Sequence, residues 1–256
     1  MLENYHTHTA RCRHAVGSEE DYVRAAIDGG LKILGFSDHT PFLFPGSYYS
    51  HMRMYPEELE NYTQTVLALK KKYTGQIDIH LGLEVEYYPQ RIDDLLRLIE
   101  PYGIEYMILG QHWCGNEENE PYNGRPTQDK ALLARYCAQI KEALHTGLFS
   151  YLAHPDLLLF TGDDPFYREQ MQLLCQEAKH LDIPLELNLL GIRSQRHYPY
   201  EPFWEIAGEA GCKVVLGSDA HSPQDTVDPQ SEKKALEIVE KYRLQLLDHV
   251  PIRSYR

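Results

Sequence analysis

The chain has 256 residues, enough for one large domain or two small ones, and barrels of alternating strands and helices often use about 250 residues as one unit. Hydrophobic residues make up 43% and aromatic residues 11%, a composition that excludes a disordered chain. The formal net charge of −13 argues against a nucleic-acid partner, because binding a phosphate backbone requires a basic face.

Targeting and redox signals are few. The five cysteines are scattered without a C-x-x-C pair, so we expect reduced thiols rather than a disulfide framework. The N-terminus lacks the basic-then-apolar run of a signal peptide, and no apolar stretch approaches the length of a membrane span. We therefore expect a soluble, cytoplasmic protein without a membrane partner, either a monomer or a homodimer.

Strand-like and helix-like segments alternate along the chain. An opening strand leads into His6 and His8, and further strands are predicted at 31–36, 76–83, 106–109, 149–153, 184–188 and 213–216. Helices are predicted at 18–28, 56–73, 90–99, 128–145, 164–181, 201–210 and 231–242, with loops at 114–127 and 191–199. Seven strands, each followed by a helix, indicate an α/β fold with a mostly parallel sheet. An open sheet and an incomplete barrel both fit this count; we see no linker and expect one domain over 1–256.

Metal-ligand residue types or other polar residues stand at the end of every predicted strand. In an extended strand His6 and His8 point to the same face, as sharing one metal ion requires. The later strands end in His39, Glu84, His112, His154, Asn188, and the pair Asp219 and His221. A barrel is favoured because the carboxyl ends of its strands meet at one mouth. Glu84 lies beside a run expected to be buried, where a carboxylate is costly unless paired or bound to metal. The pattern predicts a polynuclear metal site.

The motifs resemble those of the polymerase-and-histidinol-phosphatase (PHP) superfamily, and within it the histidinol-phosphatase branch. The resemblance covers residues 6–221 and is carried by His6-Thr7-His8-Thr9, Arg13-His14-Ala15, Gly35-Phe36-Ser37-Asp38-His39, Gly82-Leu83-Glu84, Gly110-Gln111-His112, Ala153-His154-Pro155-Asp156, Glu186-Leu187-Asn188, Gly191-Ile192-Arg193 and Gly217-Ser218-Asp219-Ala220-His221. It implies a distorted, TIM-like (β/α)7 barrel of the PHP type that binds three divalent metal ions, with zinc, manganese and iron all compatible with the ligands.

The resemblance also implies a ligand set for each ion. The first would be bound by His6, His8, Glu84 and Asp219. Glu84 would bridge to the second, which His112 and His154 complete, and the third would be bound by His14, His39 and His221. One motif departs from the pattern: Gly110-Gln111-His112-Trp113 lacks a serine and one further residue that much of the family has before the histidine. The sequence alone therefore does not fix the register of His112 within this ligand set.

Clustered cations would lower the pKa of a bridging water and bind the oxygens of a phosphate monoester, so we expect direct attack by a metal-bridging hydroxide. Glu84 and Asp219 would be the catalytic carboxylates of that centre, and Asp156 is the candidate acid for the leaving group. Candidate substrate-binding residues are Arg193, which matches an arginine of the family, and Arg13 and Arg53. The resemblance favours hydrolysis of L-histidinol phosphate in histidine biosynthesis, with the loops at 48–49 and 117–120 as possible partners of its amine and imidazole.

Three alternatives accompany this interpretation. A PHP phosphoesterase could act on another substrate, such as a phosphotyrosyl protein or a nucleotide. A metal-dependent amidohydrolase also begins with His-x-His, but this chain has Glu84 after the third strand and no lysine after the fourth. A non-catalytic metal-binding or regulatory module is expected to lose ligands, whereas all of the implied ligands are present here.

Overall fold

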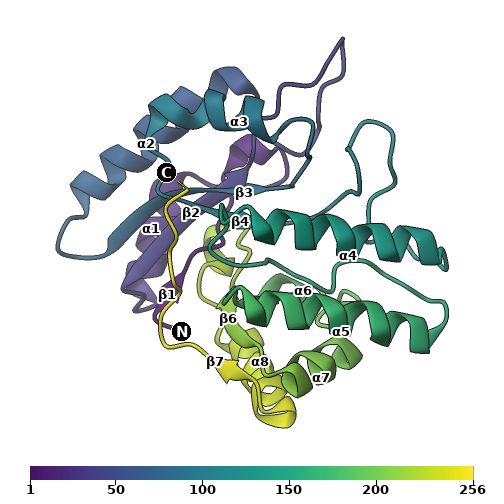
Figure 1. Cartoon of the computed structure of the whole chain (residues 1–256). Coiled ribbons are helices and arrows are strands. Elements are labelled where there is room, and N and C mark those ends of the chain that lie inside the picture. The colour runs from purple at the N-terminus through teal and green to yellow at the C-terminus, as the bar shows by residue number, and fades with distance from the viewer. Residues whose placement is uncertain (256) are drawn as a thin grey trace.

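A computed structural model of the chain describes residues 1–255, an α/β arrangement of short parallel strands surrounded by helices (Figure 1). The strands are β1 (Glu3–Asn4), β2 (Ile33–His39), β3 (Asp78–Val85), β4 (Tyr106–Leu109), β5 (Leu185–Asn188), β6 (Lys213–Gly217) and β7 (Gln245–Leu246). The α-helices are α1 (Glu19–Asp28), α2 (Leu59–Lys72), α3 (Ile92–Ile99), α4 (Lys130–His145), α5 (Asp164–His180), α6 (Leu189–Arg193), α7 (Glu201–Ala210) and α8 (Pro229–Tyr242).

The strands form two parallel sheets that single bridges join into a barrel. One sheet has the order β1-β2-β3-β4 and the other β5-β6-β7. Leu152 forms parallel bridges to both Leu109 and Leu185, which links β4 to β5. On the other side Thr7 bridges Ala220, with the His8 amide donating to the Ala220 carbonyl at 2.9 Å. The predicted distorted barrel is confirmed, and it is closed by isolated contacts rather than by continuous ladders.

The structure corrects the predicted elements at four places. β1 ends at Asn4, because the Asn4 side chain accepts hydrogen bonds from the amides of His6 and Ser218 in place of a strand neighbour. The segment 149–153 makes only the Leu152 bridges and is not a regular strand. β7 was not predicted, and α6 occupies part of the expected 191–199 loop because the Asn188 side chain caps it by accepting from the Gly191 amide.

A small cluster of apolar and tyrosine side chains fills the barrel interior below its polar end. Its members are Tyr5, Tyr106, Ile108, Tyr151, Ala153 and Val215, and they are separate from the larger core under the helices. The Tyr106 hydroxyl donates to the carbonyl of Tyr5 at 2.8 Å. Gly82 on β3 leaves room for this ring, since a Cβ there would lie 2.7 Å from Tyr106 Cδ1.

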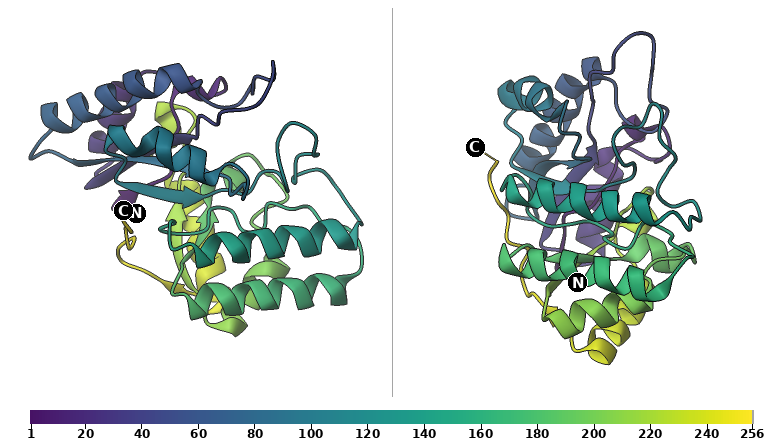
Figure 2. Two further views of the ribbon diagram at one scale, coloured as in Figure 1. Left: turned by 45° about the horizontal axis from the view of Figure 1, so that its top comes forward. Right: turned by 45° about the vertical axis from the view of Figure 1, so that its right-hand side comes forward.

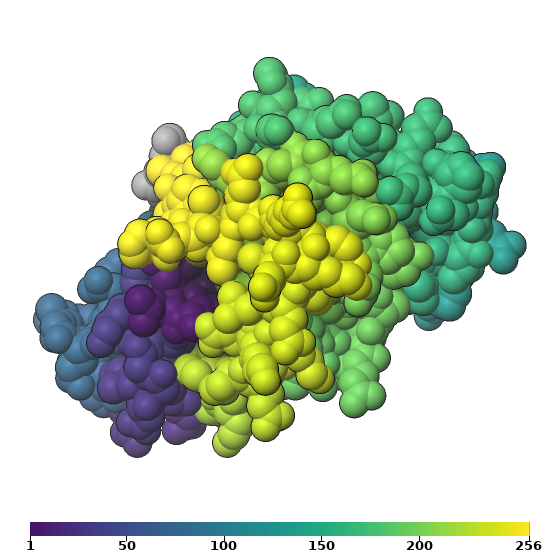
Figure 3. All heavy atoms as spheres, turned by 90° about the horizontal axis from the view of Figure 1, so that it is seen from below, coloured from purple at the N-terminus to yellow at the C-terminus, as the bar shows by residue number. Residues whose placement is uncertain are grey.

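Helices cover the outside, and the C-terminal segment covers the end where the strands begin. Helices α4 and α5 lie side by side in both views of Figure 2, and α7 packs on α5. Beyond β7 the chain runs beside the N-terminal residues (Figure 3), where the Val250 amide donates to Glu3 at 3.0 Å. Within residues 1–255 no helix has the length and apolarity needed to span a membrane.

Candidate metal centre

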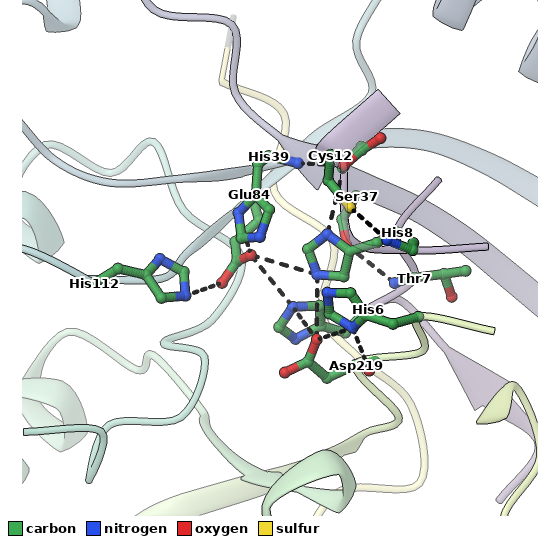
Figure 4. A network of polar contacts seen from close by, with 12 residues as sticks. His6, Thr7, His8, Cys12, Ser37, His39, Glu84, His112 and Asp219 are labelled. Atoms are coloured by element: carbon green, nitrogen blue, oxygen red, sulfur yellow. Dashed lines mark hydrogen bonds and ion pairs between the residues drawn. The ribbon is translucent and has the colours of Figure 1, made fainter. Parts of the chain in front are cut away.

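The nine predicted metal ligands converge at the carboxyl ends of the strands. Figure 4 shows imidazoles of the first, second and fourth strand ends pointing toward the carboxylates of Glu84 and Asp219. His39 and Glu84 lie on β2 and β3 and are register partners, so their side chains lie side by side. The others follow strand ends or occupy the loops beyond them: His6, His8, His14, His112, His154, Asp219 and His221.

The carboxylate of Glu84 lies at the centre of this cluster. Its Oε1 lies 2.9 Å from His154 Nε2, and its Oε2 lies 3.0 Å from His39 Nδ1. The Nε2 atoms of His6, His8 and His112 are 3.5–3.6 Å from the same carboxylate. Burial by itself would raise the pKa of Glu84, but the surrounding imidazoles, His112 first, outweigh it and keep that pKa well below its ordinary value. Glu84 is therefore a buried, ionised carboxylate shared by several imidazoles.

Asp219 forms the second carboxylate of the cluster. Its Oδ1 lies 3.2 Å from His8 Nε2, 3.3 Å from His221 Nδ1 and 3.6 Å from His6 Nε2. Donor atoms of His6, His8 and Asp219 all lie within 4.8 Å of one another. The same spacing holds for the trio His14, His39 and His221, which is the implied third ligand set, and for His6, Glu84 and His154.

The chemistry of these donors fits divalent cations. Among the residues described, several buried side-chain atoms of the cluster lack a hydrogen-bond partner: His6 Nε2, both ring nitrogens of His8, His39 Nδ1, His154 Nδ1 and Glu84 Oε2. Buried polar atoms without partners are costly, so their concentration at one place indicates a ligand. Imidazole nitrogens and carboxylate oxygens suit zinc, manganese and iron. Cys12, whose Sγ shares the 4.8 Å spacing with His8 and His221, is a nearby donor that sequence reasoning missed.

Two further carboxylates orient the histidines, and they too were missed from the sequence. His6 Nδ1 lies 2.7 Å from Glu186 Oε1, and His112 Nδ1 lies 2.8 Å from Glu86 Oε1. A carboxylate at Nδ1 leaves Nε2 free to face a metal and makes the ring a stronger ligand. The i, i+2 spacing from Glu84 to Glu86 was the available signal, because alternate residues of a strand share a face.

A cavity of about 600 Å³ opens over the cluster. Besides cluster residues, its lining consists of His51, Met52, Trp113, Tyr122, Leu190, Arg196 and Tyr198. Arg196 is the arginine in this lining, and its Nη1 donates to the Tyr198 hydroxyl at 2.8 Å. The cavity therefore combines an aromatic wall with one guanidinium above the ionised carboxylates.

The three arginines predicted to bind substrate are instead paired with carboxylates, and none of them lines this cavity. Arg13 pairs with Glu58 and its guanidinium lies 4.2 Å from the centre of the Tyr55 ring. Arg193 Nε lies 3.0 Å from Asp225 Oδ1, and its Nη1 lies 3.3 Å from Asp228 Oδ2. Arg53 is buried and pairs with Glu86 and Glu117. In these positions carboxylates occupy the three guanidinium groups, whereas Arg196 faces the cavity.

Asp156 and the glutamates of the 117–120 loop also lie outside the cavity lining and contact other residues. Asp156 Oδ2 accepts from the Tyr200 amide at 2.6 Å and from Trp204 Nε1 at 3.0 Å, and the side chain does not line the cavity. Burial raises the pKa of Asp156 to about 6, but its contacts anchor the start of α7 rather than a leaving group. In the 117–120 loop all three glutamates are paired, with Tyr48 and Arg53, with Arg91, and with Arg135.

Comparison with known proteins agrees with this geometry. The PHP domain model matches residues 4–189. The chain belongs to the PHP domain family. The chain is 31% identical over 256 residues to the histidinol-phosphatase of Bacillus subtilis, and the alignment covers 86% of this chain and 93% of its relative. It is also 31% identical over 228 residues to a protein of Deinococcus radiodurans named "Probable histidinol-phosphatase", covering 85% of each.

A solved structure shares the fold. The histidinol phosphate phosphatase of Lactococcus lactis, complexed with zinc, L-histidinol and phosphate, superposes with a TM-score of 0.73 at 20% sequence identity. The alignment covers 96% of this chain and 95% of the other. The predicted PHP-type barrel and the resemblance to the histidinol-phosphatase branch are thus both confirmed.

Proposed function

We propose that this protein is a metal-dependent phosphomonoesterase that hydrolyses L-histidinol phosphate to L-histidinol and phosphate. The observation that carries the proposal is its similarity, over most of its length, to relatives named histidinol-phosphatase. The cluster around Glu84, with its buried donors lacking partners, supports the metal dependence.

The distances within the cluster support the ligand assignment that the family resemblance implies. We assign His6, His8, Glu84 and Asp219 to a first ion, Glu84, His112 and His154 to a second, and His14, His39 and His221 to a third. Zinc, manganese or iron would suit these donors. When bound, such ions activate water as a nucleophile and neutralise the charge of a phosphate monoester.

The side chains of the chain prepare the site for this chemistry. Glu84 and Asp219 present ionised oxygens, because neighbouring imidazoles keep the pKa of each well below its ordinary value against the opposing effect of burial. Glu186 and Glu86 aim the rings of His6 and His112 at the centre. Arg196, whose guanidinium contacts the hydroxyl and the ring of Tyr198, offers a guanidinium to the phosphate or to the developing charge around it. The wall of Trp113, Tyr122 and Tyr198 would surround a flat leaving group.

This activity would place the enzyme in histidine biosynthesis, and we propose a cytoplasmic location. All five cysteines are free and buried, which suits a reducing compartment.

The test is phosphate release from L-histidinol phosphate by protein loaded separately with zinc, manganese or iron. We expect kcat/KM for L-histidinol phosphate to exceed that for p-nitrophenyl phosphate, and Glu84→Gln to abolish both activities. Equal turnover of the two esters would refute the assigned substrate. The absence of turnover with all three metals would refute the enzymatic function.

A further inference from the structure

A line of buried charged groups leads from outside the cavity to His112. The guanidinium of Arg53 donates from Nη1 to Glu86 Oε2 at 3.0 Å and from Nη2 to Glu86 Oε1 at 3.1 Å. Glu86 Oε1 in turn lies 2.8 Å from His112 Nδ1, and His112 Nε2 faces Glu84 Oε1 at 3.6 Å. Arg53 and Glu86 are 1% and 0% exposed, so this pair, joined by two hydrogen bonds, is buried inside the protein.

The opposite side of the same guanidinium contacts the loop after His112. Arg53 Nε donates to Glu117 Oε2 at 2.8 Å, and Nη2 pairs with the same oxygen. The Tyr48 hydroxyl donates to Glu117 Oε1 at 2.9 Å, and Arg53 Nη1 donates to the Thr40 carbonyl at 3.0 Å. One buried cation therefore binds two carboxylates and ties the 41–55 loop to the 114–127 loop.

His112 needs such support more than the ligands on strands do. β4 ends at Leu109, so His112 stands in a loop, whereas His39 and Glu84 are fixed by the β2–β3 ladder. His6 has its own orienting carboxylate, Glu186, which is fixed by the His154 amide and the Asn188 side chain. Within residues 1–255 no backbone amide donates to Glu86, and Arg53 supplies the two bonds that it forms besides the contact with His112.

A buried carboxylate is stable only when its charge is compensated, and a guanidinium fixes its orientation because the two groups pair through parallel hydrogen bonds. Replacing the guanidinium would leave Glu86 free to turn away from His112 Nδ1. The ring would then lose the contact that directs its Nε2 toward the centre.

We propose that Arg53 is a positioning residue for metal binding, which acts through Glu86 to aim His112 at the metal centre. This inference rests on the proposed function, in which His112 is a ligand of the second ion. Arg53 thereby serves the metal centre without touching the substrate.

The experiment compares Arg53→Met with a matched control, Arg91→Met. Arg91 also joins the same two loops, since its Nη1 donates to the Leu43 carbonyl at 3.2 Å and it pairs with Glu118. Its guanidinium lies 5.2 Å from the Phe44 ring centre and forms no hydrogen bond or ion pair with Glu86 among the described residues. The metal content of each full-length holoprotein is measured by atomic emission after dialysis against graded chelator. We expect one ion to bind about 10–100-fold more weakly in Arg53→Met, as for other outer contacts of metal ligands, and wild-type retention in Arg91→Met.

Two further variants keep the inference falsifiable should Arg53→Met fail to fold. Arg53→Lys retains the charge without the parallel hydrogen bonds, so its loss of the same ion should be intermediate. Glu117→Gln leaves the Arg53–Glu86 pair intact and should retain the metal. Wild-type metal affinity in both Arg53 variants, or an equal loss in Arg91→Met or Glu117→Gln, would overturn the inference.

His112→Ala separates this inference from the proposed function. If His112→Ala loses one ion while the Arg53 variants retain it, the ligand set stands and the role of Arg53 is refuted. If His112→Ala retains every ion, the proposed ligand set fails and the role of Arg53 fails with it.

Discussion

Gly110 leaves space for the carboxylate of Glu84, so replacing this glycine by alanine tests the geometry of the site. A methyl group added at Gly110 would lie 2.6 Å from Glu84 Cδ and 2.8 Å from Glu84 Cγ, and closer still to Oε1. Carbon atoms in contact prefer a separation of about 3.5–4.0 Å, so Gly110→Ala requires the carboxylate to move by about 1 Å. His154 and His39 stand at 2.9 and 3.0 Å from its two oxygens, which leaves no room for that movement without disturbing a ligand.

The expected loss can be estimated from this displacement. A misplacement of about 1 Å in a catalytic constellation costs on the order of 100-fold in rate, or about 2.7 kcal/mol of transition-state stabilisation. Overpacking should also lower the free energy of unfolding by about 1–3 kcal/mol. We therefore expect Gly110→Ala to reduce kcat about 100-fold for L-histidinol phosphate and to reduce bound metal, measured by phosphate release and atomic emission.

The control is an equally crowded glycine far from the cluster. A methyl at Gly208 in α7 would collide with the carbonyl oxygen of Tyr242. Gly208→Ala should lower the thermal unfolding temperature and leave metal content and kcat unchanged. Wild-type kcat and metal content in Gly110→Ala, or an equal loss of activity in Gly208→Ala, would refute the reasoning.

Four more outcomes are expected. Glu84→Ala should remove more than one ion per chain, because Glu84 is proposed to bridge two sites; atomic emission showing the loss of one ion or none would contradict the bridge. Glu186→Gln should weaken metal binding about 10–100-fold, because the His6 ring would no longer be held in place. The rate of metal release to a chelator measures this, and a rate equal to that of the wild type would contradict the role of Glu186. Arg196→Ala should lower kcat/KM about 10–100-fold, since a hydrogen bond to a charged group contributes about 1.5–3 kcal/mol, and an unaltered kcat/KM would exclude Arg196 from the phosphate site. Chelator should lower the unfolding temperature measured by calorimetry, because ligands of the native state stabilise it; an unshifted transition would argue against resident ions.

The fold and the cluster could be predicted because each depends on local patterns. Short apolar runs followed by helices indicated a mostly parallel sheet, and the polar residues at the strand ends favoured a barrel, in which those ends converge. His39 and Glu84 were therefore expected to lie close together although they are 45 residues apart in the sequence. The β2–β3 register does make them partners. The same alternation contained the signal for Glu86, which follows Glu84 by two residues, although no role was predicted for it.

The partners of the arginines could not be predicted, because they depend on tertiary contacts. Arg53 pairs with Glu86 and Glu117, 33 and 64 residues away, and no local pattern signals those encounters. Arg196 faces the cavity because α6 begins at the Asn188 cap and the chain turns after it. The end of β1 and the irregular 149–153 segment could not be predicted either. At the end of β1 the Asn4 side chain replaces a strand neighbour, and in 149–153 single bridges replace a regular ladder.

The bridge between Thr7 and Ala220 brings together two parts of the chain that lie far apart in the sequence, and the proposed metal centre takes ligands from both. His6 and His8 enter it from one side of that seam and Asp219 and His221 from the other. An ion shared across the seam would close a loop of more than 200 residues, which restricts the unfolded chain more than a local site would. During synthesis, the site becomes complete only after residue 221 has emerged, so a shorter nascent chain would contain most of the ligands without the geometry that unites them.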